Sequence, residues 1–179
     1  LLNLVGDYTI EAWVRSTGLY SNESRVFNEV YFSKNDSYSS GYHFRLSYNS
    51  ATGLDSYMWG IESQSQSSLA HPYSETEWIH FAVIGDIGAD SIDLYMDGSH
   101  VGSSTYSIST PSSAFTIGKD LMRGDGFLVG DIHAFRFSDN VRYTSSFSPE
   151  RSFQADSNTI ALWDFSAGTG ATLADLGGN

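Results

Sequence analysis

The chain has 179 residues, 40% of them hydrophobic, and carries 9 Lys and Arg against 21 Asp and Glu, a formal net charge of −12. This length is enough for one full hydrophobic core, and the negative charge disfavours binding to phosphate backbones and anionic membranes. The absence of cysteine excludes disulfides and thiolate sites, and no apolar run approaches the roughly 20 residues that span a bilayer. We therefore expect neither nucleic-acid binding nor membrane insertion.

Short runs rich in β-branched and aromatic residues, bounded by Gly, Ser, Asn and Asp, recur along the chain, whereas helical periodicity is nearly absent. From Tyr42 to Tyr48 the apolar side chains alternate with polar ones, as in a strand with one buried face. We therefore predict an all-β chain. The expected strands are Tyr8 to Arg15, Arg25 to Ser33, Tyr42 to Tyr48, Ser56 to Ile61, Glu77 to Ile84, Ser91 to Met96, Ser99 to Ser104, Ala114 to Ile117, Phe127 to Phe137 and Thr159 to Phe165.

The strongest local signal is the dipeptide Asp97-Gly98, which separates two of these runs. Asp-Gly readily adopts the positive φ angles of a tight turn, so we predict a β-hairpin here and interpret Asp97 as a turn residue rather than a ligand. Binding residues on a sheet scaffold usually lie in the longer loops. The longer loops are expected at Ser16 to Ser24, Lys34 to Ser40, Gln64 to Thr76 and Ser138 to Asn158.

Four stretches carry a resemblance to a known family. They are DYTIEAWVRS from Asp7, WIHFAVIGD from Trp78 with the following IDLYMDGSHVGS, FTIGKD from Phe115, and FLVGDIHAFRFSDNVRYTSSFSP from Phe127. Together they resemble the laminin-G-like branch of the concanavalin A-like lectin and glucanase jelly roll, which occurs in bacterial surface, phage and pentraxin-related proteins. The resemblance implies a β-sandwich of two antiparallel sheets, with ligands at the concave face or the loop rim.

The resemblance also implies how the chain is organised. We expect residues 1–179 to form a single laminin-G-like domain that is a fragment of a longer multidomain protein. Residues 159–179 would supply the last edge strand and a connecting loop. We expect the full protein to be extracellular, on the cell surface or part of a virion.

Catalytic residues are not evident in the sequence. The glucanases of this superfold carry a Glu-x-Asp-x-x-Glu pattern, and no segment of the chain matches it. The five histidines are scattered singly, without a spacing that would hold zinc or orient a general base, and His80 is interpreted as structural. We therefore expect a protein that is not an enzyme.

Two acidic segments are candidates for a calcium site, because calcium takes 6 to 8 oxygen ligands from carboxylates, amides and carbonyls. The first segment contains Asn35 and Asp36, and the second contains Asp120 and Asp125. Pentraxins, which the chain resembles, hold calcium with similar elements, although Lys119 stands here where a further oxygen ligand would help. Asp125 has two interpretations, as a solvated turn carboxylate or as a ligand of a Ca²⁺ ion shared with Asp120.

Aromatic residues are the second class of candidate binding residues, because sugars stack on aromatic rings while amides and carboxylates bind the hydroxyl groups. The family motifs contain Trp13, Trp78 and Trp163, which we assign to the core. In contrast, Trp59 and Tyr73 lie outside those motifs. The residues expected to border a glycan-binding rim are Trp59, Tyr73, Asn35, Asp36, Gln64 and Gln66.

These observations favour a non-catalytic carbohydrate-binding or adhesion module, with a glycan or a cell-surface or structural protein as partner. The alternative is a structural assembly domain of a phage fibre, virion or surface filament that binds no sugar. In that case the exposed strand edges would pack on partner chains.

Overall fold

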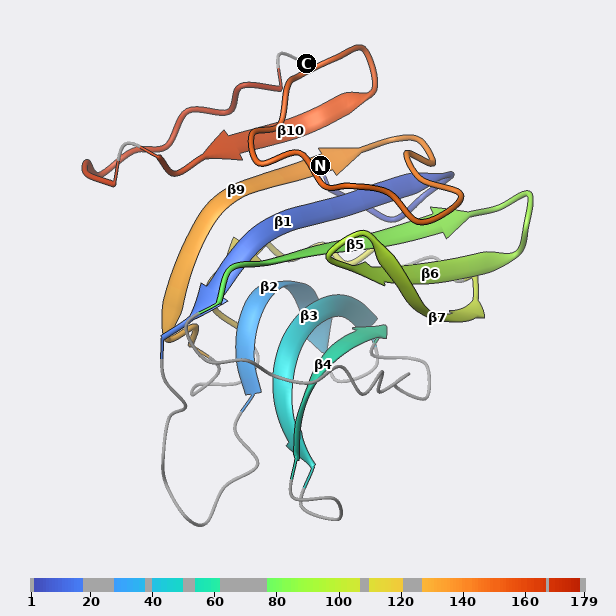
Figure 1. Ribbon diagram of the computed structural model, residues 1–179, viewed down its shortest axis with the longest axis horizontal. Helices are drawn as coiled ribbons and strands as arrows, with labels where there is room; N and C mark the ends of the chain where they lie inside the picture. Colours follow the sequence, from blue (N-terminus) through green and yellow to red (C-terminus); the bar gives the residue numbers. More distant parts are fainter. Residues whose placement is uncertain are drawn as a thin grey trace. The chain divides into compact units, whose positions relative to one another are not determined.

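The computed structural model describes residues 2–17, 28–37, 40–49, 54–61, 77–106, 110–120, 127–166 and 168–177 (Figure 1). These residues contain no helix, and hence no helical segment that could cross a membrane. The prediction of an all-β chain is confirmed. The described strands are β1 (Tyr8–Ser16), β2 (Asn28–Ser37), β3 (Ser40–Asn49), β4 (Leu54–Ile61), β5 (Ile79–Asp86), β6 (Ser91–Met96), β7 (Ser99–Thr105), β8 (Thr116–Ile117), β9 (Gly130–Ser138) and β10 (Thr159–Asp164).

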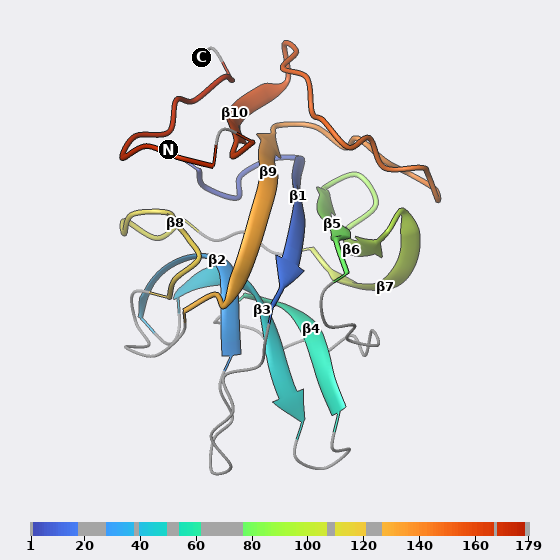
Figure 2. The same ribbon diagram turned by 60° about the vertical axis from the view of Figure 1, so that its left-hand side comes forward.

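The strands form two antiparallel sheets, as expected (Figures 1 and 2). One sheet has six strands in the order β10-β9-β1-β5-β6-β7, and the other has four in the order β4-β3-β2-β8. The chain divides into two compact units, each built around one sheet. Unit 1 comprises Leu1–Arg15, Trp78–Ser107 and Ile132–Asn179, and unit 2 comprises Ser16–Glu77 and Ile108–Asp131.

The strand β2 differs most from its predicted range. The sequence predicts a strand that ends at Ser33 and a loop from Lys34 to Ser40, but β2 continues to Ser37 and β3 begins at Ser40. Pairing with β3, in which Asn35 lies opposite Gly41, holds these polar residues in extended conformation. Neighbouring strands can thus override a low local β propensity.

The predicted hairpin between β6 and β7 is present. Asp97 and Gly98 have φ angles of 48° and 75°, which suit its two-residue turn. The Asp97 carboxylate also accepts a hydrogen bond from the His80 backbone N–H at 2.8 Å. A Cβ atom on Gly98 would lie 1.8 Å from the backbone oxygen of Phe147, so only glycine fits here.

One face of the six-stranded sheet is purely apolar along β1. Tyr8, Ile10, Ala12 and Val14 alternate with residues of the other face, and each is at most 1% exposed. Burying such side chains stabilises the fold by about 1.5–3 kcal/mol for each large one. Because alternate residues point to opposite faces, the polar residues between them share the other face.

Residues 139–158, called the covering loop below, connect β9 to β10 and pack over this second face (Figure 1). Its apolar side chains Val141, Tyr143 and Phe147 pack on a cluster of buried residues from β5 and β6. The backbone N–H of Phe147 donates to Gly98 O at 2.9 Å. A segment without strand or helix therefore completes the packing of unit 1.

Candidate functional site

Two residues predicted to bind a ligand meet in unit 2. Asn35 Nδ2 donates to Asp120 Oδ1 at 3.1 Å, and the two residues are only 3% and 1% exposed. Asn35 Oδ1 is buried without a hydrogen-bond partner among the described residues. The structure thus brings an amide and a carboxylate from distant parts of the chain into one buried polar pair.

The segment that carries Asp120 is held against β2 by hydroxyl groups. Ser33 Oγ and Thr116 Oγ1 both donate to Lys119 O, at 3.1 and 2.7 Å, and Gly118 takes a φ of 76° at the turn. Gly41, opposite Asn35, allows a close approach, since an added Cβ would lie 2.4 Å from Asn35 Cβ. The Asn35 position is therefore fixed from both sides.

Trp59 lies in unit 2 and is buried, with only 4% of its surface exposed. Its ring centre is 6.1 Å from that of Phe32 and 5.8 Å from that of Tyr42, within an aromatic cluster of this unit. Burial also raises the pKa of the Tyr42 hydroxyl well above its usual value. The glycan-binding role of Trp59 stays a prediction.

The remaining predicted site residues are only partly described. Asp36 belongs to β2 by its backbone, whereas Gln64, Gln66, Tyr73 and Asp125 lie outside the described residues. Among the residues that the structure describes, no three His, Asp or Glu side chains are grouped as a metal site would require.

The tryptophans of the family motifs lie at the border of the core rather than within it. Trp13, Trp78 and Trp163 are each partly exposed, and Trp13 packs against the buried cluster of Ala134, Phe153 and Leu162. The guanidinium carbon of Arg151 lies 4.6 Å from the ring centre of Trp13 and 5.2 Å from that of Trp78. The Trp13 and Trp78 indoles thus pack against Arg151, because a cationic head and an aromatic face attract each other.

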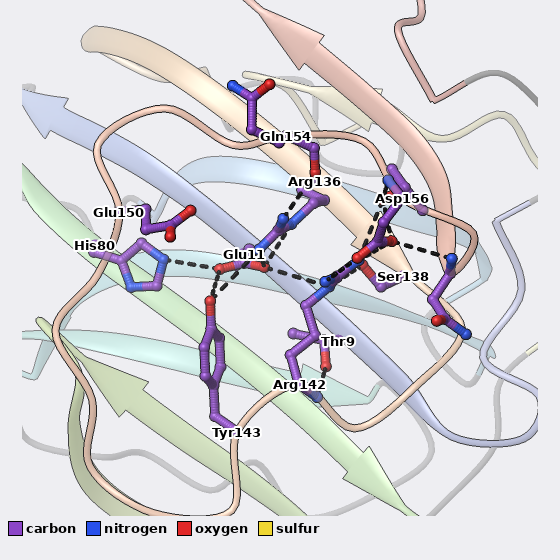
Figure 3. A network of polar contacts seen from close by, with 12 residues as sticks. Thr9, Glu11, His80, Arg136, Ser138, Arg142, Tyr143, Glu150, Gln154 and Asp156 are labelled. Carbon is purple, nitrogen blue, oxygen red and sulfur yellow. Dashed lines mark hydrogen bonds and ion pairs between the residues drawn. The ribbon is translucent and has the colours of Figure 1, made fainter.

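The most connected polar group lies in unit 1, around a single buried carboxylate (Figure 3). Glu11 on β1 is fully buried, and its Oε1 accepts hydrogen bonds from Arg136 Nε at 2.8 Å and Nη2 at 2.6 Å. Its Oε2 accepts from Tyr143 Oη at 3.0 Å and lies 3.1 Å from His80 Nε2. An ionised carboxylate only accepts hydrogen bonds, so His80 Nε2 carries the proton in this contact.

These partners determine the protonation of the network. Burial alone would raise the pKa of Glu11, but the hydrogen bond from His80 and the charge of Arg136 outweigh it and lower the pKa below its usual value near 4.5. Burial and the neighbouring Glu11 charge raise the pKa of Tyr143. Glu11 is therefore ionised and Tyr143 is a neutral hydrogen-bond donor at neutral pH.

A second ion pair joins the two ends of the covering loop. Arg142 donates from Nη1 and Nη2 to the two carboxylate oxygens of Asp156, at 2.9 and 2.8 Å, and from Nε to Ser138 Oγ at 2.6 Å. The hydrogen bond from Arg142 lowers the pKa of Asp156 far below its usual value. Such bidentate pairs are the geometrically specific kind of arginine–carboxylate contact.

Sequence reasoning identified His80 as structural but missed Glu11, Arg136 and Tyr143. The available signal was a charged residue of each sign inside an otherwise apolar run, Glu11 in DYTIEAWV and Arg136 in HAFRF. Buried charges are normally paired, so the two runs could have been expected to lie in contact.

A serine, a histidine and an aspartate also meet on the β6–β7 hairpin. His100 Nε2 lies 2.9 Å from Asp93 Oδ1 and 3.1 Å from Ser103 Oγ, and Ser103 Oγ donates to the same Asp93 oxygen. In a catalytic triad the aspartate and the serine contact different nitrogens of the imidazole. Here one nitrogen serves both contacts, so this group is a surface hydrogen-bond cluster.

Residues 1–146 match the laminin G family that is described as the concanavalin A-like lectin/glucanases superfamily. The chain therefore belongs to this family. None of the curated proteins matches the chain. As its description indicates, the superfamily contains both lectins and enzymes.

Solved structures share the fold at low sequence identity. A protein from Bacteroides ovatus, assigned as carbohydrate-binding, has a TM-score of 0.70 and 15% identity, over 97% of this chain and 50% of its own. Domain 4 of an extracellular arabinanase from Geobacillus stearothermophilus, in complex with arabinotriose, has a TM-score of 0.54 and 17% identity, over 79% of this chain and 66% of its own. A heptameric pentraxin from Limulus polyphemus has a TM-score of 0.55 and 16% identity, over 78% of this chain and 67% of its own. The chain spans half the length of the Bacteroides ovatus protein.

The lowered pKa of Glu11 predicts how the stability of the fold depends on pH. A carboxylate whose pKa is lower in the folded state stabilises the fold above its unfolded-state pKa and loses this effect as the pH falls through the folded-state value. Glu11→Gln should lower the free energy of unfolding at pH 7 by about 3–5 kcal/mol, since it leaves Arg136 buried without its counter-charge. The difference in the free energy of unfolding between the variant and the wild type should shrink as the pH falls below 4.5.

Urea unfolding at a series of pH values measures this effect. Asp164→Asn is the matched control, because the pKa of Asp164 is also lowered, by Ser166, but the carboxylate is exposed. If Glu11→Gln proved as stable as Asp164→Asn at pH 7, the buried carboxylate would not stabilise unit 1.

Proposed function

We propose that the chain is a non-catalytic carbohydrate-binding module of an extracellular or envelope-associated protein. The family and the structural neighbours support this class, since one neighbour is assigned as carbohydrate-binding and another was solved with arabinotriose. The second neighbour belongs to an extracellular enzyme, which supports the same location for this chain.

The observation that carries the proposal is the polar pair of Asn35 and Asp120. The pair is buried, so its part is to bring the end of β2 and the segment after β8 together, two segments whose amides and carboxylates are groups of the kind that bind sugar hydroxyls. The proposed ligand-binding residues around this pair are Asn35, Asp36, Trp59, Gln64, Gln66 and Tyr73.

The same pair is the proposed centre of a calcium site. The buried Oδ1 of Asn35 and the carboxylate of Asp120 are oxygen ligands of the kind that calcium prefers, and Asp36 and Asp125 would complete the set. A bound Ca²⁺ would contribute a positive charge at this end of β2 and orient the oxygen ligands around it.

The two strongest ion pairs of unit 1 are structural rather than catalytic. Glycoside hydrolysis needs two free carboxyl groups, roughly 5 to 10 Å apart, that flank the scissile bond. In the described part of the chain, Glu11 is engaged by Arg136, and Asp156 is engaged by Arg142. Neither is available as an acid or a nucleophile.

Saccharide binding is tested by a glycan array, followed by isothermal titration with the sugars that bind and with arabinotriose as a defined probe. Asn35→Ala and Tyr73→Ala should each weaken the association by about tenfold or more, the loss expected when one good contact is removed. Asn158→Ala, which removes a partly exposed amide in unit 1, is the control and should bind like the wild type. A chain that binds no sugar on the array would favour the structural assembly domain, in which an outer strand such as β7 pairs with a partner chain.

Calcium binding is tested by thermal unfolding with and without Ca²⁺. A ligand that binds only the folded state at 100 times its dissociation constant adds about 2.7 kcal/mol of stability, so the wild-type melting temperature should rise by several degrees. Asp120→Asn keeps the shape of the side chain but removes its charge, and should abolish the rise. Equal melting temperatures of the wild type with and without millimolar Ca²⁺ would contradict the calcium site.

A further inference from the structure

The covering loop and β9 border an open cavity of about 440 Å³ in unit 1. Its lining includes Arg136, Asn140, Arg142, Tyr143 and Glu150. Figure 3 shows the loop backbone running around the Glu11 network, and three members of that network, Arg136, Arg142 and Tyr143, line the cavity. Small-molecule sites in proteins usually have volumes of about 300–1,000 Å³, and this cavity lies within that range.

The wall of the cavity is held in place without a ligand. The Arg142–Asp156 pair joins the two ends of the covering loop, and Trp13 Nε1 donates to Glu150 O at 2.8 Å near its middle. A long loop without secondary structure is uncommon in a compact domain and is usually functional. Because the loop is already fixed, a ligand would not have to order it on binding.

The charges of the cavity select against an ionic ligand. The positive charges of Arg136 and Arg142 are each balanced by a bonded carboxylate, Glu11 and Asp156, and Glu150 adds one further negative charge. An anion would therefore meet guanidinium groups that are already paired. A cation would lie against these same two guanidinium groups, which leaves an uncharged ligand as the best match.

Unused hydrogen-bonding groups remain at the cavity. The contacts of Arg136 and Arg142 leave one Nη1 N–H of each guanidinium without a partner among the described residues. Asn140 Oδ1 is a buried acceptor that likewise has no partner in the described part of the chain. Donors next to acceptors match a sugar hydroxyl group, which both donates and accepts.

The aromatic wall completes this match. The rings of Tyr143 and Phe147 stack with their centres 3.5 Å apart and their planes at 5°, and both residues line the cavity. Apolar ring surface beside polar groups is the usual composition of a site for a small polar ligand.

We propose that this cavity is a second saccharide site, which binds one uncharged, hydroxyl-rich sugar unit in unit 1. The proposal shares only its ligand class with the function proposed above, because the residues of the two sites lie in different units. Arg136 and Arg142 donate to the sugar hydroxyl groups, Asn140 accepts from them, and Glu150 contributes a further acceptor at the wall.

The proposal is tested by ¹H–¹⁵N NMR titration of the whole chain with arabinotriose and a panel of uncharged mono- and disaccharides. The Nε–H signals of Arg136 and Arg142 and the indole signal of Trp13 report on the cavity, because each of these groups is hydrogen-bonded in or beside its wall. Backbone signals of Asn35 and Asp120 report on the other site. At least one sugar should shift the three signals of the cavity.

Two variants identify the binding groups. Asn140→Ala and Glu150→Gln change side chains whose polar atoms have no hydrogen bond within the described residues, so the fold should be retained. Each should weaken the association that shifts the cavity signals by about tenfold. Asn158→Ala makes the same chemical change on the same loop at a residue outside the cavity lining, and should bind like the wild type.

The outcomes separate the two sites. Shifts confined to the Asn35 and Asp120 signals would support the function proposed for unit 2 and overturn the second site. Shifts confined to the cavity signals would support the second site and contradict the first. Equal binding by Asn140→Ala, Glu150→Gln and Asn158→Ala would overturn the assignment of the cavity, even if its signals shifted.

Discussion

The buried carboxylate of Glu11 is the interaction on which unit 1 depends. An isolated charge in a protein interior is strongly unfavourable, so it persists only with partners that neutralise it and satisfy its oxygens. Arg136 supplies the charge from β9, His80 supplies a proton donor from β5, and Tyr143 supplies another from the covering loop. One side chain thereby links the central strand β1 to both neighbouring strands and to the loop above them.

The covering loop owes its position to this group. Without secondary structure of its own, it is held by Tyr143 on Glu11, by the Arg142–Asp156 pair and by Phe147 on the β6–β7 turn. Buried ion pairs often add little net stability compared with apolar residues, but breaking one is costly because it leaves a buried charge alone. Glu11 therefore contributes to the fold chiefly because it requires one arrangement of its partners. The cavity lined by Arg136 is a consequence of that arrangement.

Unit 2 presents a different polar centre. The Asn35–Asp120 pair joins the end of β2 to the segment after β8. The two units thus offer separate polar environments, a charge-balanced cavity in one and an amide–carboxylate pair in the other. Saccharide binding at both would give one module two contacts with a polymer, which raises its overall affinity without a stronger single site.

Much of the fold follows from local sequence. Alternation in β3 and β6 and the Asp97-Gly98 turn identify their strands and the hairpin, because these signals depend on neighbouring residues alone. The end of β2 could not be predicted in this way, since Asn35 is held extended by its pairing with Gly41.

Long-range packing limits what the sequence shows of the sites. Trp13 resembles a core residue in its motif, yet it lies partly exposed on the same face of β1 as Glu11, beneath Arg151. The convergence of Asn35 with Asp120, and of Glu11 with Arg136, joins residues far apart in the chain. Composition and spacing indicate such residues as candidates but do not indicate which of them meet.

Hydrogen exchange in wild type and in Glu11→Gln tests most directly whether Glu11 holds the covering loop. The backbone N–H groups of Arg142 and Phe147 are bonded to Thr9 Oγ1 and Gly98 O, and that of Val83 lies within the central strand β5. The two loop amides should exchange at least about tenfold faster in the variant relative to Val83, because the loop opens locally. An equal change at all three amides, or none, would contradict the central role of Glu11.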